Sequence, residues 1–271
     1  MVNLSSALEV ATATHPGMVR SHNEDSIAAD AEIGLAVLAD GMGGYNAGEV
    51  ASGIVVELIR TELKKTLTEK KAADLNGNSV ESLLAEHSER ANAAIYQAAQ
   101  SQPQYSGMGT TLVVAMWHDN KVSVGHIGDS RLYRLRGETL EQVTRDHSLL
   151  QEQIDSGMIT REQARHSQNK NLVTRAVGID PQVEAEVHTY GVEQGDIYLL
   201  CSDGLSDMVS DEDIQLTLNS LSANLGLAAQ QLVQQANDNG GRDNVSVILV
   251  RVNRNYPART GWFSKLKSWF G

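Results

Sequence analysis

Apolar residues recur along the chain with two different periods. In residues 47–67 and 80–98 they return every three or four positions, which is the spacing of one helix face. Helical spacing returns in residues 214–218 and 227–236. Elsewhere, short runs rich in β-branched residues and bounded by turn residues predict strands. These runs are GLAVLAD, TTLVVAMW, KVSVGHIG, RLYRLRG, VEAEVHTY, DIYLLCS and NVSVILVRV.

The order of these elements predicts the α+β class. Strands, helices, strands, helices and a final strand follow one another, whereas a parallel sheet needs strands and helices to alternate. We therefore expect a sandwich of antiparallel sheets covered by helices. No Pro-, Gly- or Ser-rich linker divides the chain, so residues 1–255 are expected to form one domain. Residues 146–178 are polar and irregular and predict a surface flap, in which a capping box from Thr160 to Gln163 marks one short helix.

Composition narrows the possible partners and compartments. The net charge of -12 argues against a nucleic-acid partner, because phosphate backbones are bound by clustered Lys and Arg. The single cysteine, Cys201, cannot form an intramolecular disulfide. The first residues, MVNLSSALEV, lack the basic segment of a signal peptide, and no run approaches 18 apolar residues. We expect a cytoplasmic monomer.

Four of the apolar runs carry an aspartate at one end. These residues are Asp40, Asp129, Asp203 and Asp243. Each alone is explained by turn chemistry, because Asp caps turns with its own side chain. Neighbouring antiparallel strands can, however, bring such ends to one rim of a sheet, where the carboxylates repel one another unless cations neutralise them. Oxygen ligands without clustered Cys or His favour Mg²⁺ or Mn²⁺ over zinc.

The stretch after Asp40 is unusually rich in glycine. Gly41, Gly43 and Gly44 follow almost at once, and glycine permits close approaches that a Cβ forbids. A strand followed by a flexible turn is the simpler interpretation. The alternative is backbone that wraps closely around the predicted ion and lends it a carbonyl oxygen.

A metal site of this kind suits phosphate chemistry. Two ions about 4 Å apart clamp a phosphoryl group, and a bridging water with a lowered pKa attacks phosphorus in line. Arg20 in HPGMVRSHNED supplies a guanidinium that matches phosphate oxygens. A surface ion pair is the alternative interpretation of an Arg beside a His and two acids.

Other catalytic chemistries do not fit the sequence. A cysteine-dependent phosphatase needs an Arg six positions after its Cys, and Cys201 is followed there by Asp207. The chain contains neither the G-x-x-x-x-G-K-[ST] phosphate loop nor an H-E-x-x-H zinc motif. Asp211 and Asp213 follow Ser210 and are expected in the first turn of a helix, where acids are favourable.

The motifs resemble, in order and spacing, those of the PPM or PP2C family of metal-dependent protein Ser/Thr phosphatases in their short bacterial form. The matching motifs, within about residues 8–252, are RSHNEDS, LADGMGG, GMGTTL, GHIGDSRLYRL, TRDHS, LVTRAVG, LLCSDGLSD and GGRDNVSVILV. The resemblance implies a central sandwich of two antiparallel β-sheets flanked on both sides by pairs of α-helices. It also implies a binuclear Mn²⁺ or Mg²⁺ centre at one end of the sandwich.

The resemblance implies roles for the residues at this centre. Asp40 corresponds to the ligand that bridges the two ions, and Gly41 gives its carbonyl oxygen to one of them. Asp203 and Asp243 correspond to ligands of the other ion. Asp129, with Asp203, is similar to the residues that support a third ion in bacterial relatives.

Residues around the ions receive roles in the same way. Glu24 of HNED and Asn244 of GRDN correspond to residues that hold metal-bound waters, and Arg20 corresponds to the residue that takes the phosphate. One departure concerns proton transfer: many eukaryotic members have a His, a candidate general acid, where this chain has Met42. His147 of TRDHS is a substitute, although its motif also fits a structural turn before a helix. We therefore expect a metal-bound water to protonate the leaving group.

The expected activity is hydrolysis of phosphoserine and phosphothreonine on proteins, opposing a bacterial Ser/Thr kinase and acting on that kinase and its targets. One alternative is a catalytically weak or dead family member that binds phosphoproteins as a regulatory module. A second is an acidic metal-binding protein without phosphate chemistry. No predicted ligand is lost, which disfavours the first, and Arg20 disfavours the second.

Residues 256–271 are expected to form a basic aromatic tail. Both phenylalanines of the chain and two of its three tryptophans lie there, and no acid follows Arg251. Along a helix, the apolar residues fall on one stripe with lysines beside it. They are Trp262, Phe263, Leu266, Trp269 and Phe270. The stripe either docks on the domain itself or binds an anionic membrane surface or a partner's groove.

Overall fold

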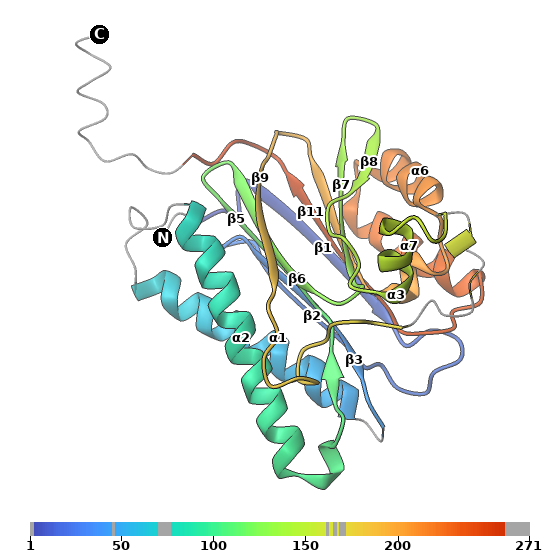
Figure 1. The fold of residues 1–271 in the computed structure, drawn as a ribbon. Coiled ribbons are helices and arrows are strands. Elements are labelled where there is room, and N and C mark those ends of the chain that lie inside the picture. Colours follow the sequence, from blue (N-terminus) through green and yellow to red (C-terminus); the bar gives the residue numbers. More distant parts are fainter. Residues whose placement is uncertain are drawn as a thin grey trace.

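Two antiparallel sheets lie face to face at the centre of the computed structural model (Figure 1). The structure describes residues 3–44, 47–69, 77–160, 163–164, 167 and 172–257. The first sheet has the order β1-β11-β10-β7-β8. Its strands are β1 (Leu8–His15), β11 (Val245–Val252), β10 (Ile197–Cys201), β7 (Arg131–Arg136) and β8 (Thr139–Gln142).

The second sheet has the order β2-β3-β5-β6-β9, and the short β4 pairs with β3 off this path. Its strands are β2 (Asp25–Asp30), β3 (Leu35–Met42), β4 (Gly109–Thr110), β5 (Leu112–His118), β6 (Lys121–Ile127) and β9 (Glu186–Gly191). Each pairing in both sheets is antiparallel. The strands therefore pair as expected and form the predicted sandwich of two antiparallel sheets.

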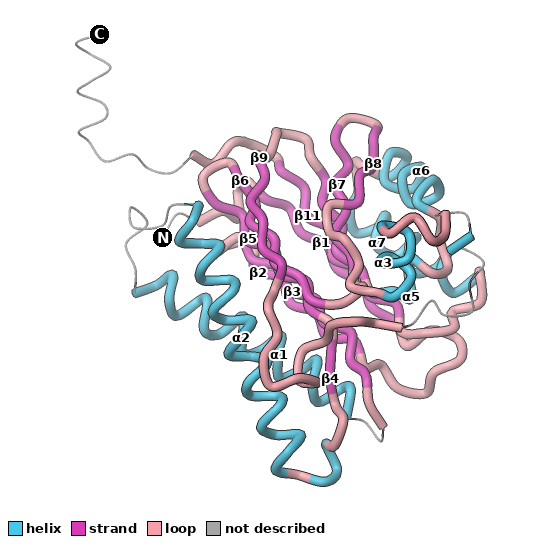
Figure 2. Tube along the Cα trace, viewed as in Figure 1, coloured by secondary structure: helices cyan, strands magenta, loops and turns pink. Residues whose placement is uncertain are grey.

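Helices cover the outer face of each sheet (Figure 2). The long α1 (Ala47–Glu69) and α2 (Gly77–Ser101) pack on the second sheet. On the first sheet lie α6 (Asp211–Leu221) and α7 (Leu225–Asp238), preceded by the short α5 (Asp203–Ser206). The 3-10 turn η2 (Pro103–Tyr105) follows α2. This arrangement confirms the predicted αββα layers.

Alternation along the central strands builds three apolar layers. In β3, Leu35 and Val37 face α1 and α2, whereas Ala36 and Leu38 face the other sheet. In β11, Val247 and its alternate neighbours face α6 and α7. Because both faces of these strands are covered, their sequences are nearly continuous apolar runs.

The flap begins with α3 (Leu149–Asp155). Ser148 caps this helix, its side chain accepting a hydrogen bond from the Gln151 amide, so TRDHS does precede a helix as its motif allowed. The capping box is also present: the Gln163 amide donates to Thr160 Oγ1 at 3.2 Å, and the Thr160 amide donates to Gln163 Oε1 at 2.8 Å. Most of the helix expected there lies outside the described residues.

Two further sequence expectations have different outcomes. Asp211 and Asp213 lie in the first turn of α6, which Ser210 caps, as predicted. The aromatic stripe from Trp262 to Phe270 lies outside the described residues, so both interpretations of the tail remain predictions.

Candidate active site

The predicted aspartates meet at one end of the sandwich. Asp25 begins β2 and lies opposite Asp40 in the register of β3. Asp129 follows β6, Asp203 opens α5 directly after β10, and Asp243 precedes β11. The strands of both sheets thus deliver five carboxylates to one rim, and the sequence expectation of convergence holds.

Burial and mutual repulsion dominate the electrostatics of this rim. Burial raises the pKa of Asp40 well above its ordinary value, and the charges of Asp25, Asp203, Asp129 and Asp243 raise it further. Burial also raises the pKa of Asp203, with Asp129 the first of the charges that add to it. The pKa values of Asp25 and Asp129 each rise to about 6, again chiefly through burial. Such a cluster is costly without cations.

The donor set fits a hard divalent cation. Asp25 Oδ2 accepts a hydrogen bond from Ser202 Oγ at 2.8 Å, but its buried Oδ1 has no hydrogen-bond partner within the described chain. A buried carboxylate oxygen of this kind needs a hydrogen or a cation. The other donors at the rim are also carboxylate oxygens, which suit Mg²⁺ or Mn²⁺.

Arg20 lies at the edge of the same cluster. Its Nη2 is 2.8 Å from Asp243 Oδ2, and its side chain is 52% exposed. The surface ion pair considered from the sequence therefore exists, but its partner is a predicted metal ligand. A phosphate held by Arg20 would lie directly beside the carboxylates.

Asn244 binds the loop that carries Arg20 and Glu24. Its Oδ1 accepts from the Glu24 amide at 2.7 Å, and its Nδ2 donates to the carbonyls of Pro16 and His22 at 3.0 and 2.8 Å. Burial raises the pKa of the Glu24 side chain, and the Arg20 charge opposes this rise. The structure thus gives Asn244 a positioning role, and the water-holding roles of Glu24 and Asn244 stay predictions.

Packing requires a glycine at position 41. A Cβ on Gly41 would lie 2.2 Å from the Gly48 carbonyl oxygen and 2.6 Å from that of Glu24. The Gly41 amide also donates to the Glu24 carbonyl at 3.1 Å. The start of α1 can therefore press against the end of β3 only because position 41 has no side chain, and its role as a carbonyl ligand stays a prediction.

Thr111 links Asp40 to the turn that carries Asp129. Its amide donates to the Asp40 carbonyl at 2.8 Å, and its Oγ1 accepts from the Asp40 amide at 3.0 Å. Thr111 Oγ1 also lies 2.7 Å from Ser130 Oγ. The backbones beside two predicted ligands are thereby fixed relative to each other.

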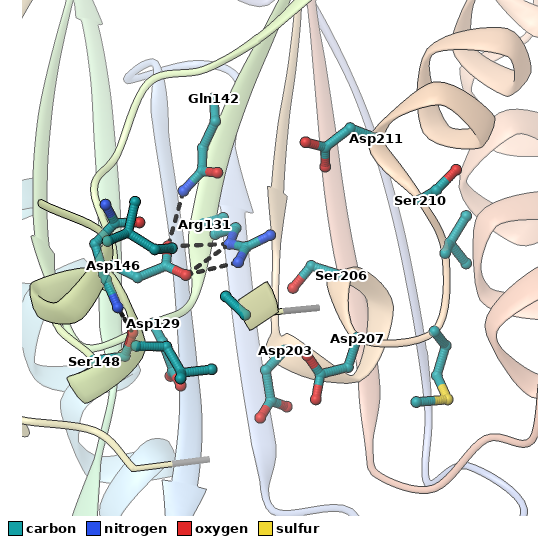
Figure 3. A pocket seen from close by; sticks show the side chains of 16 residues that line it. Asp129, Arg131, Gln142, Asp146, Ser148, Asp203, Ser206, Asp207, Ser210 and Asp211 are labelled. Atoms are coloured by element: carbon teal, nitrogen blue, oxygen red, sulfur yellow. Dashed lines mark hydrogen bonds and ion pairs between the residues drawn. The ribbon is translucent and has the colours of Figure 1, made fainter. Parts of the chain in front are cut away.

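A cavity of about 350 Å³ opens beside Asp129 and Asp203 (Figure 3). Arg131 lies in its wall and donates from Nε and Nη2 to the carboxylate of Asp146. Leu150 and Ile154 of α3 add apolar surface. The cavity therefore runs from the carboxylate cluster to the flap helix.

A second group of potential metal ligands lies beside the turn that carries Asp129. His126, His147 and Glu186 have ligand atoms within 4.8 Å of one another. His147 is buried, and burial lowers its pKa to about 4. Its Nδ1 accepts from the Gly128 amide at 3.2 Å, while Nε2 faces Glu186 Oε2 at 3.4 Å. A neutral ring with both nitrogens engaged does not suit a general acid at neutral pH.

Met42 supplies no alternative proton donor. It ends β3, where it pairs with Gly109 of β4, and its thioether carries no ionisable proton. A metal-bound water as the leaving-group acid accordingly remains the prediction.

Sequence reasoning missed Asp25 and Asp207. Asp25 follows Glu24 in RSHNEDS, and only its register with Asp40 shows that it joins the cluster. Asp207 lines the cavity and raises the pKa of Asp203 through its charge. Its position four residues after Asp203 was a usable signal, because residues four apart share a helix face.

The chain is similar to known proteins in both sequence and fold. Residues 18–238 match the family model described as protein phosphatase 2C. The serine/threonine phosphatase stp of Listeria welshimeri is 37% identical over 89% of this chain and 94% of its own length. The crystal structure of the Mycobacterium tuberculosis serine/threonine phosphatase PstP/Ppp has a TM-score of 0.82 and 37% identity, covering 92% of this chain and 100% of that one.

A further structure contains metal. The catalytic domain of PstP in complex with two manganese ions superposes with a TM-score of 0.80 at 38% identity, covering 92% of this chain and 99% of that one. The chain belongs to the protein phosphatase 2C family, which confirms the resemblance, the fold class and the assignment as a phosphoprotein phosphatase.

In the part of the chain that the structure describes, no helix has the length and apolar character needed to cross a membrane.

Proposed function

We propose that this chain hydrolyses phosphoserine and phosphothreonine on proteins at a centre of two Mn²⁺ or Mg²⁺ ions. The observation that carries the proposal is the convergence of Asp40, Asp203 and Asp243 beside Arg20. The names of the similar proteins and the manganese ions of the PstP structure support it.

Asp40, Asp203 and Asp243, with the Gly41 carbonyl, would hold the two ions, and Asp129 with Asp203 would support a third. When bound, such ions neutralise the charge of the phosphoryl group and acidify a coordinated water. Glu24 and Asn244 would hold waters at the rim of this centre. The specific ligand roles rest on the family resemblance and the oxygen-rich donor set.

Arg20 would bind and orient the phosphate. Its guanidinium pairs with Asp243, and this pair would weaken if the carboxylate also held a cation, because the cation offsets its negative charge. The planar fork of the guanidinium would then be available to match two phosphate oxygens. Metal binding and phosphate binding would in this way be coupled through one side chain.

We further propose that residues 1–255 are the phosphatase domain of a cytoplasmic monomer that opposes a Ser/Thr kinase, with 256–271 as a tail for a partner or a membrane surface. The alternative is a catalytically weak member that binds phosphoproteins. The full set of carboxylates favours the active enzyme.

Phosphate release from a phosphothreonine peptide in Mn²⁺ tests the proposal. Wild-type protein should turn over, whereas Asp203→Asn should lose activity by at least about a hundredfold and stay folded, because a ligand is lost without a cavity. Asp213→Asn, on the first turn of α6 and outside the cavity lining, is the matched control. Binding of the peptide by wild-type protein without turnover would favour the regulatory alternative.

A further inference from the structure

His147 holds the backbone of Gly128, the residue before Asp129, through both its N–H and its C=O. The Gly128 amide donates to His147 Nδ1 at 3.2 Å, and the His147 amide donates to the Gly128 carbonyl at 2.9 Å. Gly128 has a φ of +104°, and a Cβ there would lie 2.7 Å from Thr111 Cγ2. Glycine is therefore required, but glycine is also the residue whose backbone rotates most freely. Something else must fix this turn.

The ring of His147 is itself fixed. Because Nδ1 accepts a hydrogen bond, the neutral ring carries its proton on Nε2, which faces Glu186 Oε2 at 3.4 Å. The other oxygen of Glu186 lies 3.1 Å from His188 Nε2. The ring also stacks on that of His126, with centroids 4.6 Å apart.

These contacts argue against a metal ion among His126, His147 and Glu186. A metal on His147 Nε2 would move the ring proton to Nδ1, where the Gly128 N–H already points. His126 Nε2 is also engaged, since it donates to the Arg145 carbonyl at 2.8 Å. The group is better described as a hydrogen-bond chain from Glu186 through His147 to the Gly128 peptide.

The same residue joins the base of the flap. The His147 carbonyl accepts from the Thr174 amide at 2.8 Å, and the adjacent Ser148 bridges to Val173. The segment of residues 173–174, near the end of the flap, is thus bonded to His147 and Ser148.

We propose that His147, oriented by Glu186, is a positioning residue that fixes the Asp129 carboxylate for metal binding. This inference rests on the proposed function, in which Asp129 supports a third ion. Removing a group that hydrogen-bonds a metal ligand generally changes metal affinity or activity by about 10- to 100-fold. His147 acts one residue away, through the backbone of Gly128, so we expect an effect at the lower end of that range. A histidine that only fills the core would not act through Asp129.

A double-mutant cycle separates these two roles. We expect His147→Ala to lower phosphopeptide turnover by about tenfold and to weaken the third Mn²⁺ in calorimetry by about tenfold, with the two tighter ions retained. In the Asp129→Ala background the same substitution should cost less than about twofold, because its effect passes through Asp129. If the fold loss of turnover in the double variant equals the product of the two single losses, the two residues act independently and the proposal is overturned.

Rescue provides a second criterion. His147→Asn keeps an acceptor for the Gly128 amide, so it should recover most of the turnover and most of the protection of that amide from hydrogen exchange in metal-free protein. An Asn variant as impaired as the Ala variant would contradict the proposal. If His147→Ala does not fold, Glu186→Ala takes its place in the cycle with Asp129→Ala.

Two controls make the failures distinguishable. His118→Ala removes a ring at the far end of β5, where Nε2 lies 2.8 Å from Ser123 Oγ, and should leave turnover within about twofold. A loss of turnover in His118→Ala as large as that in His147→Ala would indicate general destabilisation and would contradict a positioning role for His147. Absence of wild-type turnover in Mn²⁺ would refute the proposed function. Normal wild-type turnover, together with independent effects of His147→Ala and Asp129→Ala in the double variant, would refute this inference alone.

Discussion

Asp25 and Asp40 lie directly opposite each other on β2 and β3, and the charge of Asp25 is the largest of those that raise the pKa of Asp40. Adjacent antiparallel strands force this closeness, since residues in register have their side chains on the same face. The pair belongs to the carboxylate cluster, and a proton or a cation is needed to offset the repulsion between its charges.

Replacement of Asp25 by Asn should therefore have opposite effects with and without metal. In excess chelator at pH 7, we expect the variant to be more stable than wild type by about 1–3 kcal/mol, because one repelling charge is gone. Addition of Mn²⁺ should raise the melting temperature of the variant by less than it raises that of wild type.

Asp30→Asn is the matched control, because Asp30 lies at the other end of β2 and pairs with Lys64 at 3.1 Å. The Asp30→Asn substitution should not stabilise the metal-free protein. An Asp25→Asn protein that is less stable than wild type in chelator would contradict the repulsion argument. Thermal unfolding measured by circular dichroism gives both values.

Arg20→Ala should weaken use of a phosphopeptide by about tenfold to a hundredfold, in line with the loss of ~1.5–3 kcal/mol from a charge-assisted hydrogen bond. Calorimetric Mn²⁺ affinity should not fall, because the substitution removes an ion pair with Asp243 and no proposed metal ligand. Arg60→Ala, which removes only an exposed pair with Glu57, serves as the control. Loss of Mn²⁺ binding in Arg20→Ala would make Arg20 a structural residue.

Much of this fold follows from local patterns. The alternation in β3 and the helical spacing of α1 are visible in the sequence because each residue's burial depends on its own element. Asp40 and Asp203 were identifiable because each ends an apolar run.

Other features depend on residues that are far apart in the chain. Asp25 joins the cluster through its pairing with Asp40. Arg20 and Asp243 form an ion pair although they lie near opposite ends of the domain's sequence. The contact of His147 with Gly128 and Glu186 joins three separate segments. The spacing of apolar residues along the chain does not predict such contacts, because they form only when complete strands pack together.

The stability of the metal-free protein should contain a pH-dependent contribution from His147. Its folded pKa is lowered to about 4 by burial, with His126 and Arg175 adding to the effect and Glu186 opposing it. The unfolded chain, with a His pKa of about 6.5, binds the proton more readily. This contribution is therefore present above pH 6.5 and is lost as the pH falls toward 4.

Comparison with His147→Asn isolates that contribution. Between pH 7 and pH 4.5 in chelator, wild-type protein should lose up to about 3 kcal/mol more unfolding free energy than the variant. Urea denaturation at the two pH values provides the measurement. Equal losses in the two proteins would show that His147 titrates normally in the folded state.

Deletion of residues 261–271 should leave peptide turnover nearly unchanged, because the tail lies beyond the motifs of the phosphatase domain. Binding to anionic phospholipid vesicles, or capture of a partner, should be lost if the stripe from Trp262 to Phe270 serves there. Vesicle sedimentation with neutral vesicles as control tests the membrane form. A truncated protein that does not fold would assign the tail to the core.

Metal dependence of phosphate release tests the central claim most directly. Wild-type protein is freed of metal with excess chelator, and release of inorganic phosphate from a phosphothreonine peptide is measured before and after Mn²⁺ or Mg²⁺ is restored. The carboxylate cluster predicts no turnover in chelator and recovery with either ion. Full turnover in excess chelator, or none after both ions are restored, would contradict it.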